Sequence, residues 1–462
     1  MSARNRELLG LIPASLLLTA GFAGVFIQHS GALSKLSNVS LTYGAIFLAL
    51  CVAGHLVIRL TLPHADPYLF PLAAALASVG IVEVYRIDPT AARRQAIWFV
   101  IGLVLFGATI IALRDYRKLE RYRYTIGAAS LVLLILPRLP GIGEQVNGAY
   151  LGVHVPGLGV FQPAEFAKIG LVVFLASYLR DTRQVLVMGA RRFLGVTIPP
   201  LKHFGPMLVI WGLAMMIMIL LHDVGSSLMF YGGLVAILYV ATGRVSFVVI
   251  ALIAFALGAW YLGTHIAHIH GRVEAWLHPF NPKLYGQVGG SFQIANSMFA
   301  QAAGGLFGQG FGEAIVTIPG YSTPHYLIPA PDTDMIYAVI TEELGLFGAC
   351  ALLIAYLLFV GRAFKAALMA TDSFSTLLAV GLGSVFALQV FVIVGGVTRV
   401  IPLTGVTLPF ISYGGSSIVA NLVLVAVLLL VSDRARRPPG RPASVGLGTA
   451  PEREFPEVRA RG

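Results

Sequence analysis

The sequence predicts an all-α polytopic membrane protein. Of its 462 residues, 57% are hydrophobic and only 11% are charged, and the mean hydropathy is +0.82. Ordinary soluble domains carry roughly 25% charged residues. The apolar residues gather in runs of about 20, the length of a transmembrane helix, whereas outer-membrane barrels have short alternating strands. The formal net charge of +11 fits basic loops at an anionic lipid surface, and no nucleic-acid partner is predicted.

Twelve apolar windows predict twelve membrane spans. The first window follows Arg4 and Arg6 and lacks a small-residue cleavage pattern, so we expect a retained span instead of a removed signal peptide. The fifth window is short and would need extension or tilt to cross a bilayer. The windows cover approximately residues 8–28, 41–61, 68–87, 95–113, 124–137, 163–179, 204–221, 226–242, 246–264, 335–360, 374–398 and 413–432.

Lysine and arginine residues predict how these spans are oriented. Basic residues are concentrated in the loops 114–123 and 180–203 and in the run 434–437, all of which fall on one side. The positive-inside rule makes that side cytoplasmic, so both termini are predicted to be in the cytoplasm. Three residues on the other side are the main exception to this rule: Arg86, Arg93 and Arg94.

Two connections on the predicted external side are unusually long, at residues 138–162 and 265–334. Loops of this length are usually functional, and their scattered apolar residues predict that they lie along the membrane surface. The tail 433–462 combines five prolines with charges and glycine, which predicts a disordered cytoplasmic segment.

Two acids stand just before the apolar run that starts at Met335. Asp332 or Thr333 is expected to be the N-cap of the helix, with Asp334 in its first turn, where the helix dipole favours a carboxylate. Two acids exceed what a cap needs, and Glu342 follows eight residues after Asp334 on nearly the same helical face. Acids inside a membrane cost about 2.5–3.5 kcal/mol each and usually mark a function. A partly desolvated carboxylate beside other acids has a raised pKa, which suits a general base.

Two further polar motifs lie near predicted external helix ends. Glu165 and Lys168 are three residues apart on one helical face after Gln162. They are either a structural ion pair or a site in which Lys168 presents its ammonium group to a phosphate. Asp223, followed by Gly225, is either an ordinary turn and N-cap residue or a functional acid.

Three other patterns are interpreted as structural. The histidines 265, 268 and 270 have no carboxylate at a suitable spacing, so no metal site is predicted. The glycine-rich run 304–312 lacks the lysine of a nucleotide-binding loop. Cys51 and Cys350 both lie in apolar runs, and neither a disulfide nor a Cys-based metal site is predicted.

Taken together, four ordered motifs resemble the SEDS family of cell-wall polymerases, whose members include RodA and FtsW. The strongest match is residues 402–417 (PLTGVTLPFISYGGSS). The second joins Thr333-Asp334 to residues 342–348 (EELGLFG). The third is Gln162 to Glu165 with Lys168, and the fourth is Asp223 with Gly225. The resemblance covers roughly residues 66–432, and residues 396–399 (GVTR) with the N-terminal extension resemble actinobacterial RodA-type members more than FtsW.

This resemblance implies a ten-helix core over residues 66–432, preceded by an extension of two spans in residues 1–65. It implies a bacterial cytoplasmic-membrane enzyme that polymerises lipid II together with a class B penicillin-binding protein, in elongation or in division. Asp334 matches the family's essential acid, and Glu165 and Lys168 match its other polar helix residues. The family usually has Arg and Trp soon after the motif that begins at Asn147, but this sequence has Leu and Gly there. Arg272, Lys283 or Arg399 are candidates to replace the missing Arg.

The resulting hypothesis is an inverting glycosyl transfer on the external face of the membrane. Asp334 would act as general base, and Lys168, a nearby Arg or a bound divalent ion would stabilise the leaving diphosphate. No organic cofactor is predicted. An apolar groove between helices would hold the lipid tails, and the two long loops would hold the sugars. The alternatives are a lipid II flippase, which would move the lipid without polymer, and a structural scaffold of the cell-wall machinery.

Overall fold

The computed structural model describes residues 2–30, 33–146, 149–157, 159–188, 191–193, 196–198, 201–287, 290–318 and 325–437. Two features of the sequence analysis fall outside these residues. They are Asn147 and nearly all of the tail predicted to be disordered, since the description ends at residue 437.

Each of the twelve predicted windows overlaps one helix of the structure, which confirms the all-α polytopic class. Within the described residues, nine helices are long and apolar enough to cross a membrane, and the stretch Gly205–Leu220 is a shorter apolar helix. The fifth window is the 13-residue α5, which continues into a 3-10 turn at Leu136–Arg138. The twelve helices are α1 (Ala3–Ser30), α2 (Leu33–Thr61), α3 (Leu69–Ile87), α4 (Pro89–Ala112), α5 (Arg123–Ile135), α6 (Ala164–Met188), α7 (Leu201–Leu220), α8 (Val224–Thr242), α9 (Val245–His265), α13 (Ile336–Met369), α14 (Ser373–Val397) and α15 (Gly415–Arg436).

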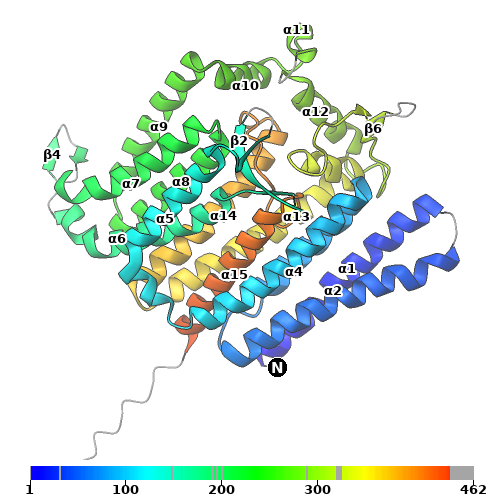
Figure 1. Cartoon of the computed structure of the whole chain (residues 1–462), viewed down its shortest axis with the longest axis horizontal. Coiled ribbons are helices and arrows are strands. Elements are labelled where there is room, and N and C mark those ends of the chain that lie inside the picture. The colour runs from blue at the N-terminus through cyan, green and yellow to red at the C-terminus, as the bar shows by residue number, and fades with distance from the viewer. Residues whose placement is uncertain are drawn as a thin grey trace, which may run out of the picture.

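Helix α15 is the centre of the bundle. It is apolar on all sides and nearly every residue from Gly415 to Asp433 is buried, as expected for a helix surrounded by others. It packs against α3, α4, α6, α13 and α14. The helices α1 and α2 form a hairpin along α3 and α4 at one edge of the bundle (Figure 1). The predicted ten-helix core therefore corresponds to α3–α9 and α13–α15, and the division at residues 65 and 66 stays a prediction.

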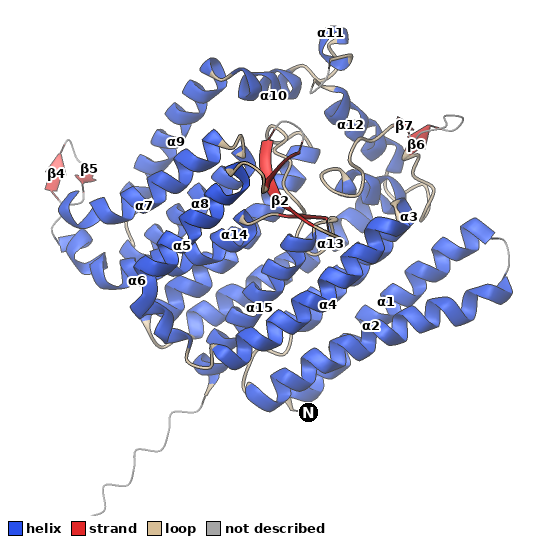
Figure 2. Ribbon diagram, viewed as in Figure 1, coloured by secondary structure: helices blue, strands red, loops and turns tan. Residues whose placement is uncertain are grey.

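The long connections contain secondary structure, which the sequence did not reveal. Residues 138–162 form an antiparallel sheet of three strands, β1 (Gly143–Val146), β2 (Ala149–Val155) and β3 (Gly159–Phe161), with Val153 paired to Phe161. Figure 2 shows this sheet near the middle of the view, between α15 below it and α10 above it. Residues 265–334 contain α10 (Ala267–Leu277), α11 (Pro282–Tyr285), α12 (Phe292–Gly304) and the short pair β6 (Thr317–Ile318) and β7 (His325–Tyr326). A further pair, β4 (Arg191–Phe193) and β5 (Val196–Ile198), follows α6.

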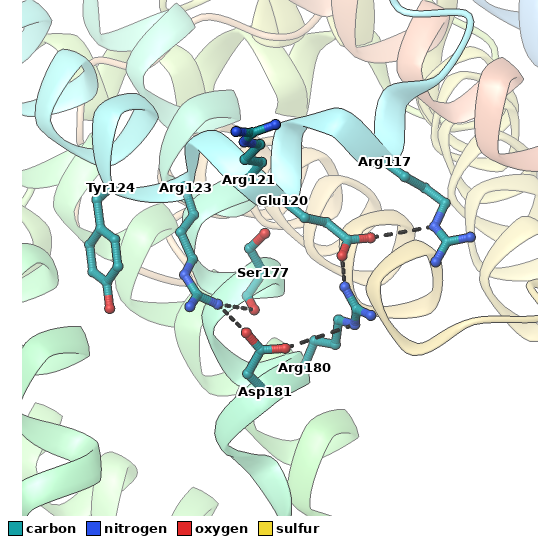
Figure 3. A pocket seen from close by; sticks show the side chains of 8 residues that line it. All are labelled: Arg117, Glu120, Arg121, Arg123, Tyr124, Ser177, Arg180 and Asp181. Atoms are coloured by element: carbon teal, nitrogen blue, oxygen red, sulfur yellow. Dashed lines mark hydrogen bonds and ion pairs between the residues drawn. The ribbon is translucent and has the colours of Figure 1, made fainter.

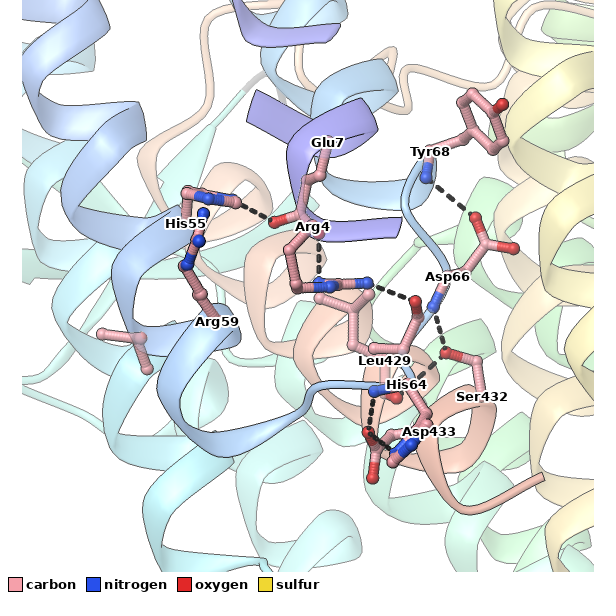
Figure 4. A network of polar contacts seen from close by, with 12 residues as sticks. Arg4, Glu7, His55, Arg59, His64, Asp66, Tyr68, Leu429, Ser432 and Asp433 are labelled. Carbon is pink, nitrogen blue, oxygen red and sulfur yellow. Dashed lines mark hydrogen bonds and ion pairs between the residues drawn. The ribbon is translucent and has the colours of Figure 1, made fainter. Parts of the chain in front are cut away.

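Polar contacts join the start of α1 to the end of α15 at one end of the bundle (Figure 4). The guanidinium group of Arg4 donates to the Ala65 carbonyl oxygen. The backbone N–H of His64 donates to Asp433 Oδ1 at 2.8 Å, and that of Asp66 donates to Ser432 Oγ at 3.0 Å. The start of α1 and the end of α15 thus lie at the same end of the bundle, as a topology with an even number of spans requires.

The same end carries the basic loops that the sequence predicted to be cytoplasmic. Arg117, Arg123 and Arg180 surround Glu120 and Asp181 in a charged pocket (Figure 3). Arg117 Nε lies 3.6 Å from Glu120 Oε1, and Arg180 pairs with both acids. These pairs join the 3-10 helix at Tyr116–Tyr122 to α6, so part of this basic cluster has a structural role.

Candidate functional site

The α14–α15 loop (residues 398–414) forms the scaffold of the site. Gln95 of α4 binds it at two points, donating to the Ser412 carbonyl oxygen and accepting from the Gly414 N–H, both at 3.3 Å. Helix α3 approaches so closely that a Cβ at Gly80 would lie 2.4 Å from a carbonyl oxygen of the loop. These contacts place the loop at the end of the bundle that lies opposite the start of α1 and the end of α15. We call the end that carries the loop the Asp334 end.

The turn that carries the two acids is bonded to this loop. The Tyr413 N–H donates to the Asp332 carbonyl oxygen at 2.7 Å, and the Ser412 hydroxyl donates to the Thr333 carbonyl oxygen at 2.7 Å. The Thr333 hydroxyl donates to the Ala330 carbonyl oxygen at 3.4 Å. The loop and the turn therefore hold each other through backbone groups, and Asp334 is fixed without using its own side chain.

The expectation that one of these residues caps α13 is wrong. The N-cap position belongs to Met335, whose side chain makes no capping hydrogen bond. The backbone oxygens of Asp332 and Thr333 are instead occupied by the α14–α15 loop. Tertiary contacts to these carbonyl oxygens thus hold the turn in place, without a side-chain cap.

Asp334 lies against the α14–α15 loop and stays partly accessible to solvent. Gly405 has a φ of +76°, and a Cβ built there would lie 3.3 Å from Asp334 Oδ2. The pKa of Asp334 is raised to about 6, chiefly by burial; the charge of Arg272 opposes this shift, and that of the neighbouring Asp332 adds to it. A carboxyl group with this pKa is largely ionised at neutral pH and still basic enough to accept a proton.

Arg272 is the cation beside this acid. Helix α10 carries it over the α14–α15 loop, where its Nη1 donates to the carbonyl oxygens of Thr404 at 2.9 Å and Leu403 at 3.3 Å. Burial lowers the pKa of Arg272, and the charges of Asp334 and Asp223 act in the opposite direction. Of the three cations considered as replacements for the missing Arg, Arg272 is the one that interacts electrostatically with Asp334.

Asp223 joins the site through the start of α8. Its Oδ1 accepts the Ser226 N–H at 3.0 Å, which makes it the N-cap of α8, as one reading of the sequence expected. A Cβ at Gly225 would lie 2.5 Å from the Val406 side chain, so α8 packs directly on the α14–α15 loop. Burial raises the pKa of Asp223, and the charge of Glu165 adds to this while Arg272 lowers it. Asp223 thus belongs to the same electrostatic group as Asp334.

Glu165 and Lys168 form a buried pair inside the bundle. Lys168 is 2% exposed, and its ammonium group donates to Glu165 and, at 2.7 Å, to Gln389 Oε1 of α14. Gln389 Nε2 donates in turn to the Thr407 carbonyl oxygen at 3.0 Å. The enclosed ammonium fits the ion-pair alternative better than direct contact with a phosphate. Nearby, the Gln162 N–H donates to Ser416 Oγ at 3.1 Å, which ties the start of α6 to α15.

Other predicted residues lie away from Asp334. Arg399 donates to the carbonyl oxygens of Trp276 at 2.9 Å and Leu277 at 3.1 Å, so its guanidinium group caps the end of α10. Lys283 is exposed on α11. Glu342 is not among the groups that shift the pKa of Asp334.

The acids inside α13 belong to a separate cluster. Glu343 pairs with Arg86 of α3, and its Oε2 accepts the Gly312 N–H at 3.0 Å. The helix is kinked at Gly345, whose φ is +65°. This pairing explains why Arg86 departs from the positive-inside rule, because its charge is neutralised inside the protein.

Three functional features escaped the sequence analysis. Gln95 and Gln389 are both fully buried polar residues within apolar helices, and that placement was the available signal. The sheet β1–β3 gave only a weak signal because its strands are short.

Among the described residues, no group of three or more His, Cys, Asp or Glu side chains is arranged to hold a metal ion.

The comparisons with known proteins agree with the resemblance found in the sequence. Residues 68–437 match the FtsW/RodA/SpoVE family, described as cell cycle proteins. The chain is 38% identical over 447 residues to peptidoglycan glycosyltransferase RodA of Mycobacterium tuberculosis H37Rv, which covers 94% of this chain and 92% of the relative. It is 33% identical over 386 residues to a probable peptidoglycan glycosyltransferase FtsW of Geobacter metallireducens, covering 81% of this chain and 96% of the relative.

Two solved structures have a similar fold. A chain of a peptidoglycan synthase complex that coordinates polymerization and crosslinking aligns with a TM-score of 0.64 at 26% identity, covering 81% of this chain and 99% of that chain. Thermus thermophilus Rod shape determining protein RodA aligns with a TM-score of 0.56 at 26% identity, covering 81% of this chain and 98% of that chain. The mycobacterial relative covers more of the chain than these structures do.

Proposed function

The chain belongs to the FtsW/RodA/SpoVE family, and we propose that it is a peptidoglycan glycosyltransferase of the RodA type that polymerises lipid II. The observation that carries this proposal is Asp334. It is a partly accessible carboxyl group with a pKa of about 6, held by the α14–α15 loop beside Arg272. That loop and turn contain the two motifs that most resemble the family.

Asp334 is the general base of an inverting transfer. It takes the proton from the 4-hydroxyl group of the GlcNAc of the acceptor lipid II. The hydroxyl oxygen then attacks the anomeric carbon of the MurNAc at the end of the donor chain. A new C–O bond forms as the bond to undecaprenyl diphosphate breaks, and the diphosphate leaves with the electron pair. A positioned general base typically contributes about 10²–10⁴-fold to such a step.

The leaving diphosphate needs positive charge, and Arg272 is the best-placed source. Its Nη1 is occupied by two carbonyl oxygens, which fixes the guanidinium group beside Asp334. Fixed charge in a water-poor site stabilises a developing anion without reorganisation. A divalent ion bound with the diphosphate would add further charge. Lys168, with Glu165, acts as a positioning residue that orders α6 and α14 beneath the loop.

The Asp334 end faces the outside of the bacterial cytoplasmic membrane, and both termini are cytoplasmic. The basic loops at the opposite end support this orientation. The partner is a class B penicillin-binding protein that cross-links the new strands. The fold similarity to a chain of a complex that coordinates polymerization and crosslinking supports this partnership.

The test follows the glycan product. The full chain is purified with its partner and incubated with lipid II, and polymer is resolved on gels. Asp334→Asn should lower the polymerisation rate by about 10²–10⁴-fold, whereas Asp332→Asn, a matched change in the same turn, should retain most of it. A folded Asp334→Asn variant with parental activity would refute the general base. Headgroup translocation in vesicles without any polymer would favour the flippase.

A further inference from the structure

An apolar slot separates the α1–α2 hairpin from the core. Four helices line it: Leu18 and Phe22 come from α1, Phe47 and Leu50 from α2, and α3 and α4 supply the opposite wall. Its volume is about 350 Å³. No residue of the α14–α15 loop or of the turn that carries Asp334 lines the slot, so it is separate from the site described above.

The slot is open to the surface that faces lipid. Ile46, Ile97 and Val100 line it and are 53%, 48% and 39% exposed, so its mouth faces the lipid in a membrane. Phe47 and Phe99, which both line the slot, stack with their ring centroids 5.4 Å apart. The slot is thus walled by apolar and aromatic side chains, the lining that an acyl chain requires.

The upper end of the slot is polar and carries a free positive charge. Tyr43, Tyr85 and Arg93 line this end, and Tyr85 interacts electrostatically with the other two. No acidic side chain of the described residues forms an ion pair with Arg93, which is exposed near the start of α4. Asp88, the nearest acid in the chain, uses its Oδ1 to cap Thr90 N–H at 2.7 Å.

We propose that this slot binds an anionic phospholipid, with one acyl chain between the hairpin and α4 and the phosphate on Arg93. The charge explains why Arg93 stands at the Asp334 end, against the positive-inside rule. Unlike Arg86, which is neutralised by Glu343, Arg93 is left for a ligand from outside the chain.

The chemistry of the slot predicts that the headgroup, and not the acyl chain, determines which lipid binds, and that an anionic headgroup is preferred. Any lipid tail can fill an apolar slot in a bilayer, because burial in protein gains little over burial among other tails. Selectivity must therefore come from the polar end. There, a guanidinium group pairs with a phosphate, and basic pockets between membrane helices are typical sites for anionic lipids. Two phenol groups beside Arg93 offer further hydrogen bonds.

The test measures lipid binding to the full chain in detergent by native mass spectrometry. Dioleoyl phosphatidylglycerol is titrated against the parental protein and three variants. Arg93→Gln removes the charge, and Ala96→Phe fills the slot at one of its lining residues. Arg94→Gln is the matched control, because it removes the adjacent exposed arginine, which does not line the slot. Dioleoyl phosphatidylcholine and undecaprenyl phosphate are titrated in parallel.

We expect one phosphatidylglycerol molecule to be retained more tightly than the rest. Arg93→Gln should weaken it by about fivefold, the effect of about 1 kcal/mol per basic residue, and Ala96→Phe should abolish it, while Arg94→Gln leaves it unchanged. Equal retention in all four proteins would overturn the proposal, as would equal retention of phosphatidylcholine. Preferential retention of undecaprenyl phosphate would overturn the assignment to a phospholipid. Thermal stabilisation of the parental protein by phosphatidylglycerol, lost in Arg93→Gln, provides a second readout.

Discussion

At the residue scale, the protonation of Asp334 sets the pH dependence of the proposed reaction. A general base works only when ionised, so kcat/KM should rise with pH and level off above about 6. Arg272 lowers the pKa of this carboxyl group. Arg272→Gln should therefore raise that pKa and move the acidic limb of the profile to higher pH, in addition to lowering the maximal rate. Lipid II polymerisation measured between pH 5 and 9 gives both values.

The control for this experiment is Lys283→Gln, which removes one exposed positive charge from the same connection. It should leave the acidic limb in place. If both variants moved the limb equally, a general surface-charge effect would explain the shift and the specific coupling of Arg272 to Asp334 would be disproved.

Gly405 provides a second residue-scale prediction. Its φ of +76° is a left-handed conformation, which costs a residue with a side chain roughly 1–2 kcal/mol. Gly405→Ala should therefore lower stability by about that amount and, because its Cβ would press on Asp334 Oδ2, should also lower the polymerisation rate. Gly243→Ala is the matched control: its φ is +64°, but nothing lies within 4 Å of a Cβ there. Thermal unfolding should respond similarly in both variants and activity only in Gly405→Ala; equal rates would contradict the predicted contact.

At the element scale, the pair Glu165 and Lys168 determines how α6 meets α14. Lys168→Met leaves the buried Glu165 carboxyl group without its partner, and removing one partner of a buried ion pair costs about 3–5 kcal/mol. Replacing both by apolar residues, in Glu165→Leu with Lys168→Met, should recover most of this loss. Thermal unfolding of the two single variants and the double variant measures the coupling.

Activity of the same double variant separates the two roles considered for Lys168. If the pair only orders the helices, a stable double variant keeps substantial polymerisation activity. A stable but inactive double variant would argue against the positioning role and for direct contact with the diphosphate.

At the scale of the whole molecule, the bilayer determines what a sequence can predict. A membrane fixes the length and polarity of each span, so all twelve windows could be found from runs of apolar residues in the sequence. The loop helices α10 and α12 have no such constraint and are stabilised by packing. Arg272, for example, meets the α14–α15 loop from α10, a helix that was not predicted.

The candidate site was predictable in part: its residue types could be named from the sequence, but their assembly could not. Asp334, Asp223 and Arg272 were all named from the sequence, and the structure brings them into one electrostatic group. Their assembly depends on backbone contacts such as Ser412 to Thr333, which no residue pattern encodes. The orientation of Arg399 toward α10 is likewise a tertiary feature, since an arginine on a predicted external loop can point either way.

Asp66, just before α3, joins α13 to α15 and gives the last prediction. Its fully buried carboxylate pairs with Arg362 of α13 and Arg436 of α15. Its Oδ1 also accepts the Tyr68 N–H at 2.9 Å (Figure 4). Asp66→Asn keeps an oxygen for Tyr68 but leaves two largely buried guanidinium groups without a counter-charge. Breaking a buried pair in this way costs about 3–5 kcal/mol, so the melting temperature should fall strongly.

Asp433→Asn is the matched control for Asp66→Asn, because Asp433 is equally buried but its partner Arg437 is 57% exposed. Water can solvate that arginine when its partner loses its charge, and exposed pairs contribute about 1 kcal/mol or less. Thermal unfolding should therefore rank Asp66→Asn well below Asp433→Asn and the parental protein. Equal melting temperatures for the two variants would mean that the charge on Asp66 is not what holds α13 and α15 together where the chain enters the core.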